Sequence, residues 1–311
     1  MATSGRVRSW TRRVAICVGT LVLALVLLLA GLYTFLSRTN SALASSGETR
    51  RYQIHVPEGY NPSNAVPLVI SLHGAWLYPG MQQRLTGWND LADKRGFIVA
   101  YPRAHGFPRT WHLEPGSGLD TELRFFSDLI DEISTRYNID PARIYVNGYS
   151  NGAAMTFMLS CRLAGRIAAF GMVATPVVPW EWCQDTRPVP MLAIHGTADP
   201  YSPYAGGENF LTTEPLPSIN AWMVRWGERN GCGDEPQTTA PASDVRLLDY
   251  GDCAQGAAAR LYVLEDSGHI WPGGLRLPEF GTGHYTDSIN ATNEMWTFFQ
   301  QHPLPAAAAA P

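Results

Sequence analysis

Short apolar runs alternate with longer amphipathic segments along most of the chain. Several of these runs are solid aliphatic stretches, as expected of strands that are buried on both faces. The alternation predicts an α/β fold with a mostly parallel sheet flanked by helices. The expected strands are Arg51–Val56, Pro67–Leu72, Phe97–Tyr101, Ile144–Gly148, Ala168–Val173, Met191–His195 and Leu261–Leu264. The expected helices are Glu122–Tyr137, Gly152–Leu163, Ser218–Asn230 and Asp287–Gln301, with Asp287 or Ser288 as the N-cap of the last.

The N-terminus departs from this pattern. Val14–Leu36 is an almost uninterrupted apolar run without a charge, long enough to span a bilayer as one helix. Arginines 6, 8, 12 and 13 precede the run and only Arg38 follows it closely, which predicts a cytoplasmic N-terminus and an exported remainder. Ala42-Leu43-Ala44 has the spacing of a signal-peptidase site, so both a cleaved signal and an uncleaved anchor stay open. The length of the run favours the anchor, because cleaved signals usually have an apolar core of about 7 to 15 residues.

Five segments follow from these patterns. They are a basic cytoplasmic region at 1–13, a transmembrane anchor or signal segment at 14–36, a linker at 37–48, a catalytic domain at 49–302 and an Ala/Pro-rich tail at 303–311. We expect no second domain in the remaining chain.

The charge distribution argues against some partners. The first 44 residues carry five arginines and no acid, which leaves 18 basic and 27 acidic residues beyond them, a formal charge of −9. Nucleic acids and anionic surfaces are bound through basic patches. We therefore expect no nucleic-acid partner, and membrane contact only through the N-terminal segment if it is uncleaved.

Four cysteines lie in the exported part, and an even number in an oxidising compartment suggests two disulfides. They are Cys161, Cys183, Cys232 and Cys253. Four cysteines allow three connectivities. Sequence proximity favours Cys161 with Cys183 and Cys232 with Cys253, and buried free thiols are the alternative.

A serine lies at the centre of a Gly-x-Ser-x-Gly pattern. Gly148-Tyr149-Ser150-Asn151-Gly152 follows an expected strand and opens an expected helix, which is the context of a nucleophile elbow. Glycines two positions before and after the serine avoid clashes in so tight a turn. A Ser/Gly turn that only caps the helix is the alternative interpretation, and the pattern alone is weak. Its context predicts Ser150 as the nucleophile.

An acid and a histidine follow in the order that this fold requires. Asp199 lies just beyond the expected strand Met191–His195, and His269 lies beyond Leu261–Leu264. We expect His269 to act as general base and Asp199 to orient it, although Asp199 can also serve an Asx-turn and His269 can be a packed histidine. Asp252 and Asp266 are alternative acids and His284 an alternative base, but they lack the same placement after a strand.

The strand Pro67–Leu72 ends at His73-Gly74-Ala75, where an α/β-hydrolase supplies an oxyanion donor. We expect the main-chain N–H groups of Ala75 and Asn151 to form the oxyanion hole. His73 is expected to support this loop rather than to ionise.

Four sequence blocks resemble the extracellular esterase family that contains polyhydroxybutyrate depolymerases and feruloyl esterases. They are Leu72-His73-Gly74, the stretch from Thr86-Gly87-Trp88-Asn89-Asp90 to Tyr101-Pro102, the elbow after Ile139-Asp140-Pro141-Ala142-Arg143, and Gly268-His269-Ile270-Trp271-Pro272-Gly273. Ile289-Asn290-Ala291-Thr292 also fits, so the resemblance spans roughly residues 50 to 300.

The resemblance implies an α/β-hydrolase fold, the triad of Ser150, Asp199 and His269, and disulfides at similar positions. The chain departs from the family pattern at Ala75-Trp76, where relatives often carry Gly or Cys, and at Glu122, where they often carry Asp.

Aromatic side chains on several loops are candidates for contact with substrate. Trp271 follows the candidate base directly, and Trp76 lies on the oxyanion loop; Trp111, Trp180 and Trp182 occupy other loops. A tryptophan ring can stack on a phenolic acyl group or a sugar, although tryptophan is also ordinary core material. We select Trp271 and Trp76 as expected substrate-binding residues.

Together these features predict a serine carboxylic-ester hydrolase that acts outside the cytoplasm on a small-molecule or oligomeric ester. It is expected to work through an acyl-enzyme on Ser150, without a metal or an organic cofactor. An acyltransferase or a peptidase using the same triad is one alternative, and a non-catalytic envelope binding module is another. The sequence does not identify the natural ester or the oligomeric state.

Overall fold

Ten strands form one sheet in the computed structural model, which describes residues 3–183, 187–207 and 215–305. Their order is β1-β2-β4-β3-β5-β6-β7-β10-β9-β8, and the central strands β4, β3, β5, β6, β7 and β10 are parallel to one another. Antiparallel strands extend both edges. The strands are β1 Ser41–Ser45, β2 Glu48–His55, β3 Val66–Leu72, β4 Ile98–Pro102, β5 Ile139–Tyr149, β6 Ala169–Val173, β7 Met191–Gly196, β8 Gln237–Ala242, β9 Val245–Tyr250 and β10 Ala259–Leu264.

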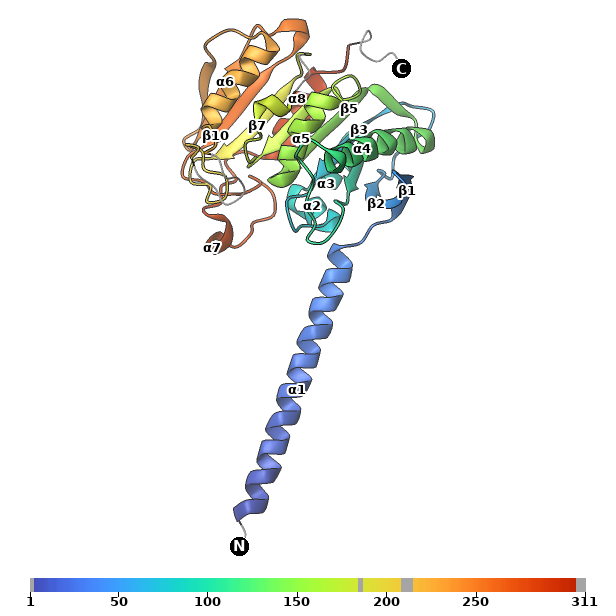
Figure 1. Ribbon diagram of the computed structural model, residues 1–311, viewed down its shortest axis with the longest axis vertical. Helices are drawn as coiled ribbons and strands as arrows, with labels where there is room; N and C mark the ends of the chain where they lie inside the picture. Colours follow the sequence, from blue (N-terminus) through green and yellow to red (C-terminus); the bar gives the residue numbers. More distant parts are fainter. Residues whose placement is uncertain (1–2, 184–186, 208–214, 306–311) are drawn as a thin grey trace. The chain divides into compact units, whose positions relative to one another are not determined.

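Helices cover both faces of the sheet (Figure 1). One core cluster joins the sheet to the long helices α4, α5 and α6 and includes Phe126, Phe157 and Trp226. The other joins it to α2, α3 and α8 and includes Trp88 and Phe299. The helices are α1 Thr3–Leu36, α2 Pro79–Thr86, α3 Trp88–Arg95, α4 Ser117–Arg136, α5 Asn151–Arg162, α6 Ile219–Asn230, α7 Glu279–Thr282 and α8 Ala291–Gln301, with 3₁₀ turns η1 Trp180–Trp182 and η2 Ala254–Gly256. The expected three-layer α/β-hydrolase arrangement is therefore present.

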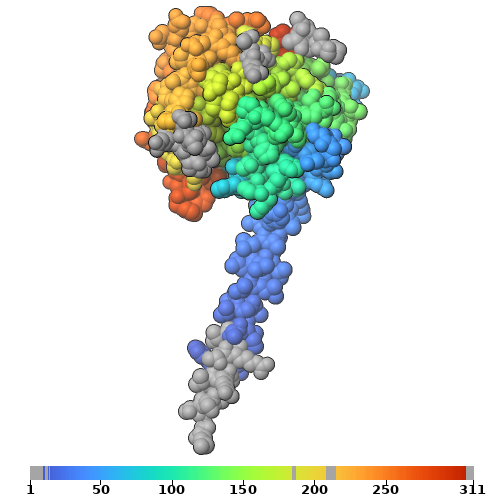
Figure 2. Space-filling model, in the orientation of Figure 1, coloured from blue at the N-terminus to red at the C-terminus, as the bar shows by residue number. Residues whose placement is uncertain are grey.

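Helix α1 is a separate unit, comprising residues 1–38, and the rest of the chain forms the second unit. Within α1, Ala15–Leu36 is long and apolar enough to cross a membrane. Its apolar side chains are exposed rather than packed, and Figure 2 draws the described part of this helix in blue. This is the expected N-terminal hydrophobic helix.

The expected linker at 37–48 is wrong in its second half, because residues 41–45 form strand β1. All five residues of β1 pair with β2 in an antiparallel hairpin, from Ser41 opposite Tyr52 to Ser45 opposite Glu48. Leu43 and Ser45 are buried, since they face α4 while alternate residues face solvent. Five residues with Leu43 as their one large apolar side chain carry too little apolar pattern for a strand to be predicted from them.

Several other boundaries differ from those expected. Helix α4 begins at Ser117 rather than at Glu122, and β5 begins at Ile139 rather than at Ile144. Helix α8 begins at Ala291, and its N-cap is Asn290, whose side chain accepts a 2.9 Å hydrogen bond from the Asn293 N–H; neither Asp287 nor Ser288 caps it. The expected tail begins too early at 303, because Leu304 is buried and its N–H donates to the Ala142 oxygen at 2.8 Å. The rest of that tail, 306–311, lies outside the described residues.

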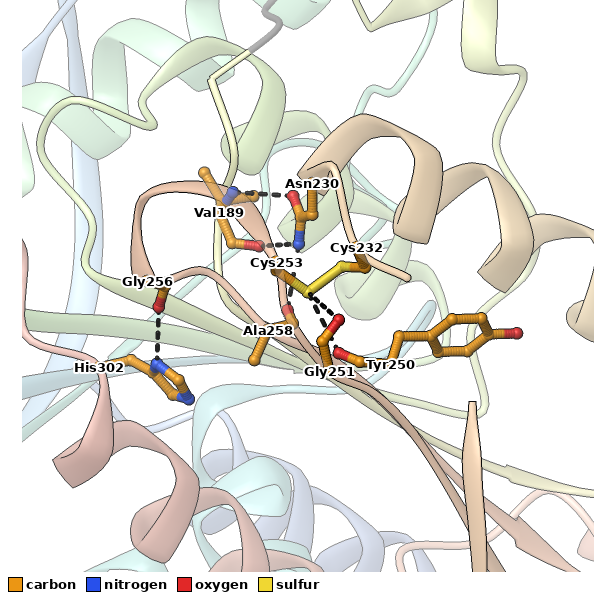
Figure 3. The surroundings of a disulfide bond; sticks show 9 residues. All are labelled: Val189, Asn230, Cys232, Tyr250, Gly251, Cys253, Gly256, Ala258 and His302. Carbon is orange, nitrogen blue, oxygen red and sulfur yellow. Dashed lines mark hydrogen bonds between the residues drawn. A yellow bond between two sulfur atoms is a disulfide. The ribbon is translucent and has the colours of Figure 1, made fainter. Parts of the chain in front are cut away.

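Two disulfides join distant parts of the second unit, with the pairing that sequence proximity favours. Cys161 at the end of α5 pairs with Cys183 after η1, and Cys232 after α6 pairs with Cys253 after β9. Near the second bond, Asn230 accepts from the Val189 N–H at 3.0 Å and donates to the oxygens of Val189 and Ala258 (Figure 3). The C-terminal end of α6 is thus fixed to the segments that lead into β7 and β10.

Candidate active site

Ser150 lies at the sharp turn between β5 and α5 and has strained backbone angles. Its φ of 55° and ψ of −124° are rarely adopted by a residue with a side chain. A Cβ on Gly148 would lie 2.2 Å from the Gly152 oxygen, and one on Gly152 would lie 2.5 Å from the Leu72 oxygen. The turn therefore excludes side chains at both positions, which is the steric role expected of these glycines.

Asp199 uses both carboxylate oxygens. Its Oδ1 accepts hydrogen bonds from the N–H groups of Tyr201 and Ser202, each at 2.8 Å. The Asx-turn, one of the two roles considered for Asp199, is therefore present. Its Oδ2 lies 2.7 Å from Nδ1 of His269, with both side chains almost fully buried. One side chain thus shapes the loop after β7 and also holds the imidazole.

The loop that carries His269 is held by neighbouring backbone and side chains. The His269 N–H donates to the Thr282 oxygen at 2.6 Å, and the Tyr149 hydroxyl donates to the His269 oxygen at 2.8 Å. The ring of Tyr201 packs edge-on to the imidazole at a centroid distance of 5.2 Å. A Cβ on Gly196 would lie 2.2 Å from the Ser267 oxygen, so the loops after β7 and β10 are in direct contact.

These contacts bring the three expected triad residues to the same edge of the sheet. Tyr149, adjacent to Ser150, contacts His269 through its hydroxyl and through its ring, at a centroid distance of 5.0 Å. No hydrogen bond joins Ser150 Oγ to His269 among the described residues. Such bonds are often long in a free enzyme and shorten when substrate binds.

The alternative acids and base make other contacts. The Asp266 N–H donates to Thr197 Oγ1, and His284 lies 3.9 Å from Glu279. Asp252 and Asp266 both have positive φ in turns. The carboxylate that reaches His269 Nδ1 belongs to Asp199.

The loop after β3 lies against the nucleophile. A Cβ on Gly74 would lie 3.2 Å from Ser150 Cβ, which brings the Gly74-Ala75 backbone beside the serine. The N–H groups of Trp76 and Leu77 are occupied by the oxygens of Arg109 and Gly74. The Ala75 N–H has no acceptor within the described chain, and that of Asn151 is at the open N-terminus of α5.

His73 supports this loop in its neutral form. Its Nδ1 lies 2.7 Å from the Gly74 oxygen and its Nε2 accepts from the Ala104 N–H at 3.1 Å, which fixes one tautomer. Burial lowers the pKa of His73 to about 4. Trp111 joins this loop to the elbow, because its Nε1 donates to the His73 oxygen at 2.9 Å and its N–H donates to Asn151 Oδ1 at 2.8 Å.

The site favours a charged Asp199. Burial acts to raise the pKa of this carboxyl, but the hydrogen bond and charge of His269 and the charge of His195 together bring the pKa below its ordinary value. His195 itself lies 3.6 Å from Asp199 Oδ2, and burial lowers the pKa of its imidazole. A negative carboxylate behind Nδ1 suits an imidazole that must accept a proton at Nε2.

A cleft of about 540 Å³ borders the elbow at Asn151. One wall is the segment 111–118 and the other is the segment 176–182 after β6. Valine, proline, leucine and tryptophan make up most of the lining, and the size is within the range of small-molecule sites. We call it the elbow cleft.

The two tryptophans selected from the sequence as substrate-binding candidates differ in their exposure. Trp271 is buried, with 1% of its surface exposed, and its Nε1 donates to Thr292 Oγ1 at 3.1 Å. The expected contact with substrate is therefore wrong for Trp271, which is part of the core beneath the loop. Trp76 is 67% exposed beside the oxyanion loop and stays a candidate.

Sequence reasoning missed several supporting residues. Tyr149, Tyr201 and His195 contact the acid and base, and His112 lines the cleft. Only Tyr149 had a signal in the sequence, namely its place inside the elbow. The described residues contain no group of three or more His, Cys, Asp or Glu side chains able to hold a metal ion.

Comparisons with known proteins agree with this geometry. A family model described as "Esterase PHB depolymerase" matches residues 50–184. The chain is 36% identical over 234 residues to a bifunctional acetylxylan esterase/xylanase of Neocallimastix patriciarum, covering 74% of this chain and 32% of the relative. It is 28% identical over 235 residues to feruloyl esterase B of Piromyces equi, covering 71% and 42%. The chain thus spans less than half the length of either relative.

A solved structure shares the fold. The acetyl xylan esterase from Aspergillus awamori superposes with a TM-score of 0.58 at 15% identity, covering 81% of this chain and 94% of that one. The fold is therefore shared with an esterase over most of both chains.

Proposed function

The chain belongs to the esterase family of polyhydroxybutyrate depolymerases and feruloyl esterases, in the α/β-hydrolase superfamily, and we propose that it hydrolyses carboxylic esters through an acyl-enzyme on Ser150. The observation that carries the proposal is the buried 2.7 Å contact between His269 Nδ1 and Asp199 Oδ2, held beside a strained serine. A paired imidazole and a serine at an elbow are what acyl transfer requires.

In the first half of the reaction, Ser150 Oγ attacks the acyl carbon while His269 Nε2 takes the hydroxyl proton. The carbonyl oxygen becomes an oxyanion, which the N–H groups of Ala75 and Asn151 stabilise. His269 then gives the proton to the leaving alcohol, and the acyl group stays on Ser150. Asp199 keeps the Nδ1–H tautomer and stabilises the imidazolium.

In the second half, water replaces the alcohol. His269 Nε2 takes a proton from the water, whose oxygen attacks the acyl carbon. The bond between the acyl carbon and Ser150 Oγ then breaks, His269 Nε2 gives its proton to Oγ, and the carboxylic acid is released. The comparisons do not favour the acyltransferase, peptidase or binding-module alternatives.

The test is turnover of a panel of acetyl, butyryl and cinnamoyl esters by residues 39–311, with Ser150→Ala as the matched variant. We expect wild-type hydrolysis and a loss of at least about a thousandfold in the variant. A folded, disulfide-bonded wild type that hydrolyses no ester would overturn the proposal, as would a Ser150→Ala protein of undiminished activity.

Two disulfides and an N-terminal apolar helix indicate an extracellular location for the catalytic unit. We infer further that α1 remains attached as a membrane anchor. The candidate cleavage site, Ala42-Leu43-Ala44, lies within β1, and a cut after Ala44 would remove four of its five residues. That cut would also remove the buried Leu43 and the Ser41 hydroxyl that accepts from Arg136.

Fractionation of cells that make the full chain tests the anchor. We expect an intact chain in the membrane fraction, released by detergent and not by high salt or carbonate. A protein beginning at Ser45 in the medium, identified by N-terminal sequencing, would show that the segment is a cleaved signal.

A further inference from the structure

Among the described residues, the elbow cleft is lined by Asn151, next to the nucleophile, and by no residue of the loop that carries the candidate base. The leaving alcohol must lie within hydrogen-bond reach of His269 Nε2 in order to receive its proton. The acyl part of the substrate is therefore the part that can enter the elbow cleft.

The walls of the cleft suit a large apolar acyl group. Trp111, Val177 and Val178 line the cleft and are buried, and Trp182, which also lines it, is half-buried. A volume of about 540 Å³ far exceeds the needs of an acetyl group. The lining nevertheless includes one polar ring, that of His112.

His112 lies against the start of α4. A Cβ on Gly118 would lie 3.2 Å from Cγ of the imidazole and 3.3 Å from its Nδ1, so a side chain at position 118 would press on the ring. Its Nδ1 is 3.9 Å from Glu122 Oε1, while the histidine side chain as a whole is about half exposed. The ring therefore faces the carboxylate with its Nδ1 side and also lines the cleft.

Glu122 is a buried carboxylate with one oxygen unused. Its side chain is 1% exposed, and Oε2 accepts a 2.8 Å bond from Arg50, which also stacks on Phe125 at 3.9 Å. Oε1 is buried and has no hydrogen-bond partner among the described residues. A buried carboxylate oxygen without a donor is costly. Two donors can supply it after a small movement: Nη1 of Arg50, which also has no partner among the described residues, and the Nδ1–H of His112.

We propose that His112, backed by Glu122, is the residue that determines acyl specificity, by accepting a hydrogen bond from a hydroxyl on an otherwise apolar acyl group. An Nδ1–H directed at Glu122 leaves the Nε2 lone pair as the acceptor, because the partner of one ring nitrogen sets the role of the other. The proposal rests on the proposed esterase function.

The test compares two acyl groups that differ only in the hydroxyl. The substrates are methyl 4-hydroxycinnamate and methyl cinnamate, and the quantity is the ratio of their kcat/KM values. We expect the wild type to prefer the hydroxylated ester and His112→Phe to lower the ratio about fivefold, mainly through KM, because a hydrogen bond of this kind contributes about 1 kcal/mol. His112→Gln, which keeps an acceptor, should retain part of the preference.

His55→Phe is the matched control, because His55 is not among the residues that line the elbow cleft. It pairs with Asp93 and lies opposite Val99, near the start of β4. It should keep the wild-type ratio. An unchanged ratio in His112→Phe would overturn the assignment, and so would a wild type that hydrolyses acetyl esters but neither cinnamate. A folded wild type inactive on every ester, acetyl included, would instead count against the proposed function itself.

Discussion

The hydroxyl of Tyr149 donates a 2.8 Å hydrogen bond to the main-chain oxygen of His269. The residue beside the candidate nucleophile thus holds the backbone of the candidate base, across 120 residues of sequence. If this bond were removed, water would have little access to replace it, because Tyr149 is buried.

Tyr149→Phe should therefore lower both stability and turnover. We expect a loss of about 1 kcal/mol in the free energy of unfolding, from one buried hydrogen bond. We also expect kcat to fall several-fold with little change in KM, since the base loses support and the cleft does not. Urea unfolding and steady-state kinetics measure the two effects, and a variant equal to wild type in both would mean that this bond does not position His269.

The double use of the Asp199 carboxylate separates its catalytic role from its structural one. Asp199→Asn keeps an oxygen for the N–H groups of Tyr201 and Ser202 but no longer favours the Nδ1–H tautomer of His269. We expect kcat to fall by about 10³ to 10⁴ at nearly unchanged secondary structure.

Asp199→Ala removes both functions and serves as the comparison. It should be as inactive as Asp199→Asn and less stable by about 1 to 3 kcal/mol, because two buried N–H groups lose their acceptor. If Asp199→Asn keeps full activity, the acid of the triad must be sought elsewhere, and Asp252 and Asp266 are the candidates to replace.

Burial of His73 makes stability depend on pH. Its pKa is about 4 in the folded chain and about 6.5 when unfolded, so the unfolded chain binds more protons between these values. Stability must then fall as the pH falls through this window, by about 3 kcal/mol in all.

The variant His73→Asn should show a weaker pH dependence between pH 7 and pH 4, whatever its stability at pH 7. Comparing the slopes is necessary because burial also lowers the pKa values of His195 and His302. Urea unfolding at intervals of half a pH unit gives these slopes. Parallel curves for the two proteins would refute the prediction.

The elbow should not tolerate a methyl group at Gly152. A Cβ there would lie 2.5 Å from the Leu72 oxygen and 2.6 Å from the His73 oxygen, both of them backbone atoms. Gly152→Ala should destabilise the fold by several kcal/mol and displace Ser150.

Gly165→Ala is the matched control, because nothing lies within 4 Å of its Cβ. That variant should be neutral or stabilising by up to about 1 kcal/mol. Thermal unfolding of both variants makes the comparison, and equal Tm values for the two would contradict the steric account.

Strand β1 should contribute measurably to the second unit. Residues 39–311 retain the hairpin with β2, whereas residues 45–311 lose Ser41 to Ala44 and expose the partners of Leu43. We expect the shorter protein to be less stable by about 1 to 3 kcal/mol, the usual contribution of one buried leucine side chain. Thermal unfolding of the two proteins tests this, and equal Tm values would remove the argument against cleavage after Ala44.

The parallel core of the sheet was predictable because its strands are continuous apolar runs. The edge strands were not, since β8 is exposed along nearly its whole length and β1 is short and has one large apolar side chain, that of Leu43. Their pairing depends on neighbours distant in sequence, which local periodicity does not record.

The candidate triad could be selected from strand-end placement, but its environment could not. Trp271 follows His269 in sequence and yet points into the core, because adjacent residues in a loop need not share a direction. His112 and Glu122 are ten residues apart, and only the fold places a buried carboxylate oxygen beside a ring that lines the cleft.

The Cys161–Cys183 disulfide joins the far end of α5 to the end of η1, where one wall of the elbow cleft finishes. The bond closes a covalent ring of residues 161–183, which contains the wall opposite segment 111–118 and is attached to the far end of the helix that starts at the elbow. A chain that folds where its thiols stay reduced keeps Ser150, Asp199 and His269 but lacks this closure. If the chain is exported as proposed, oxidation is a maturation step that closes the ring beside the cleft.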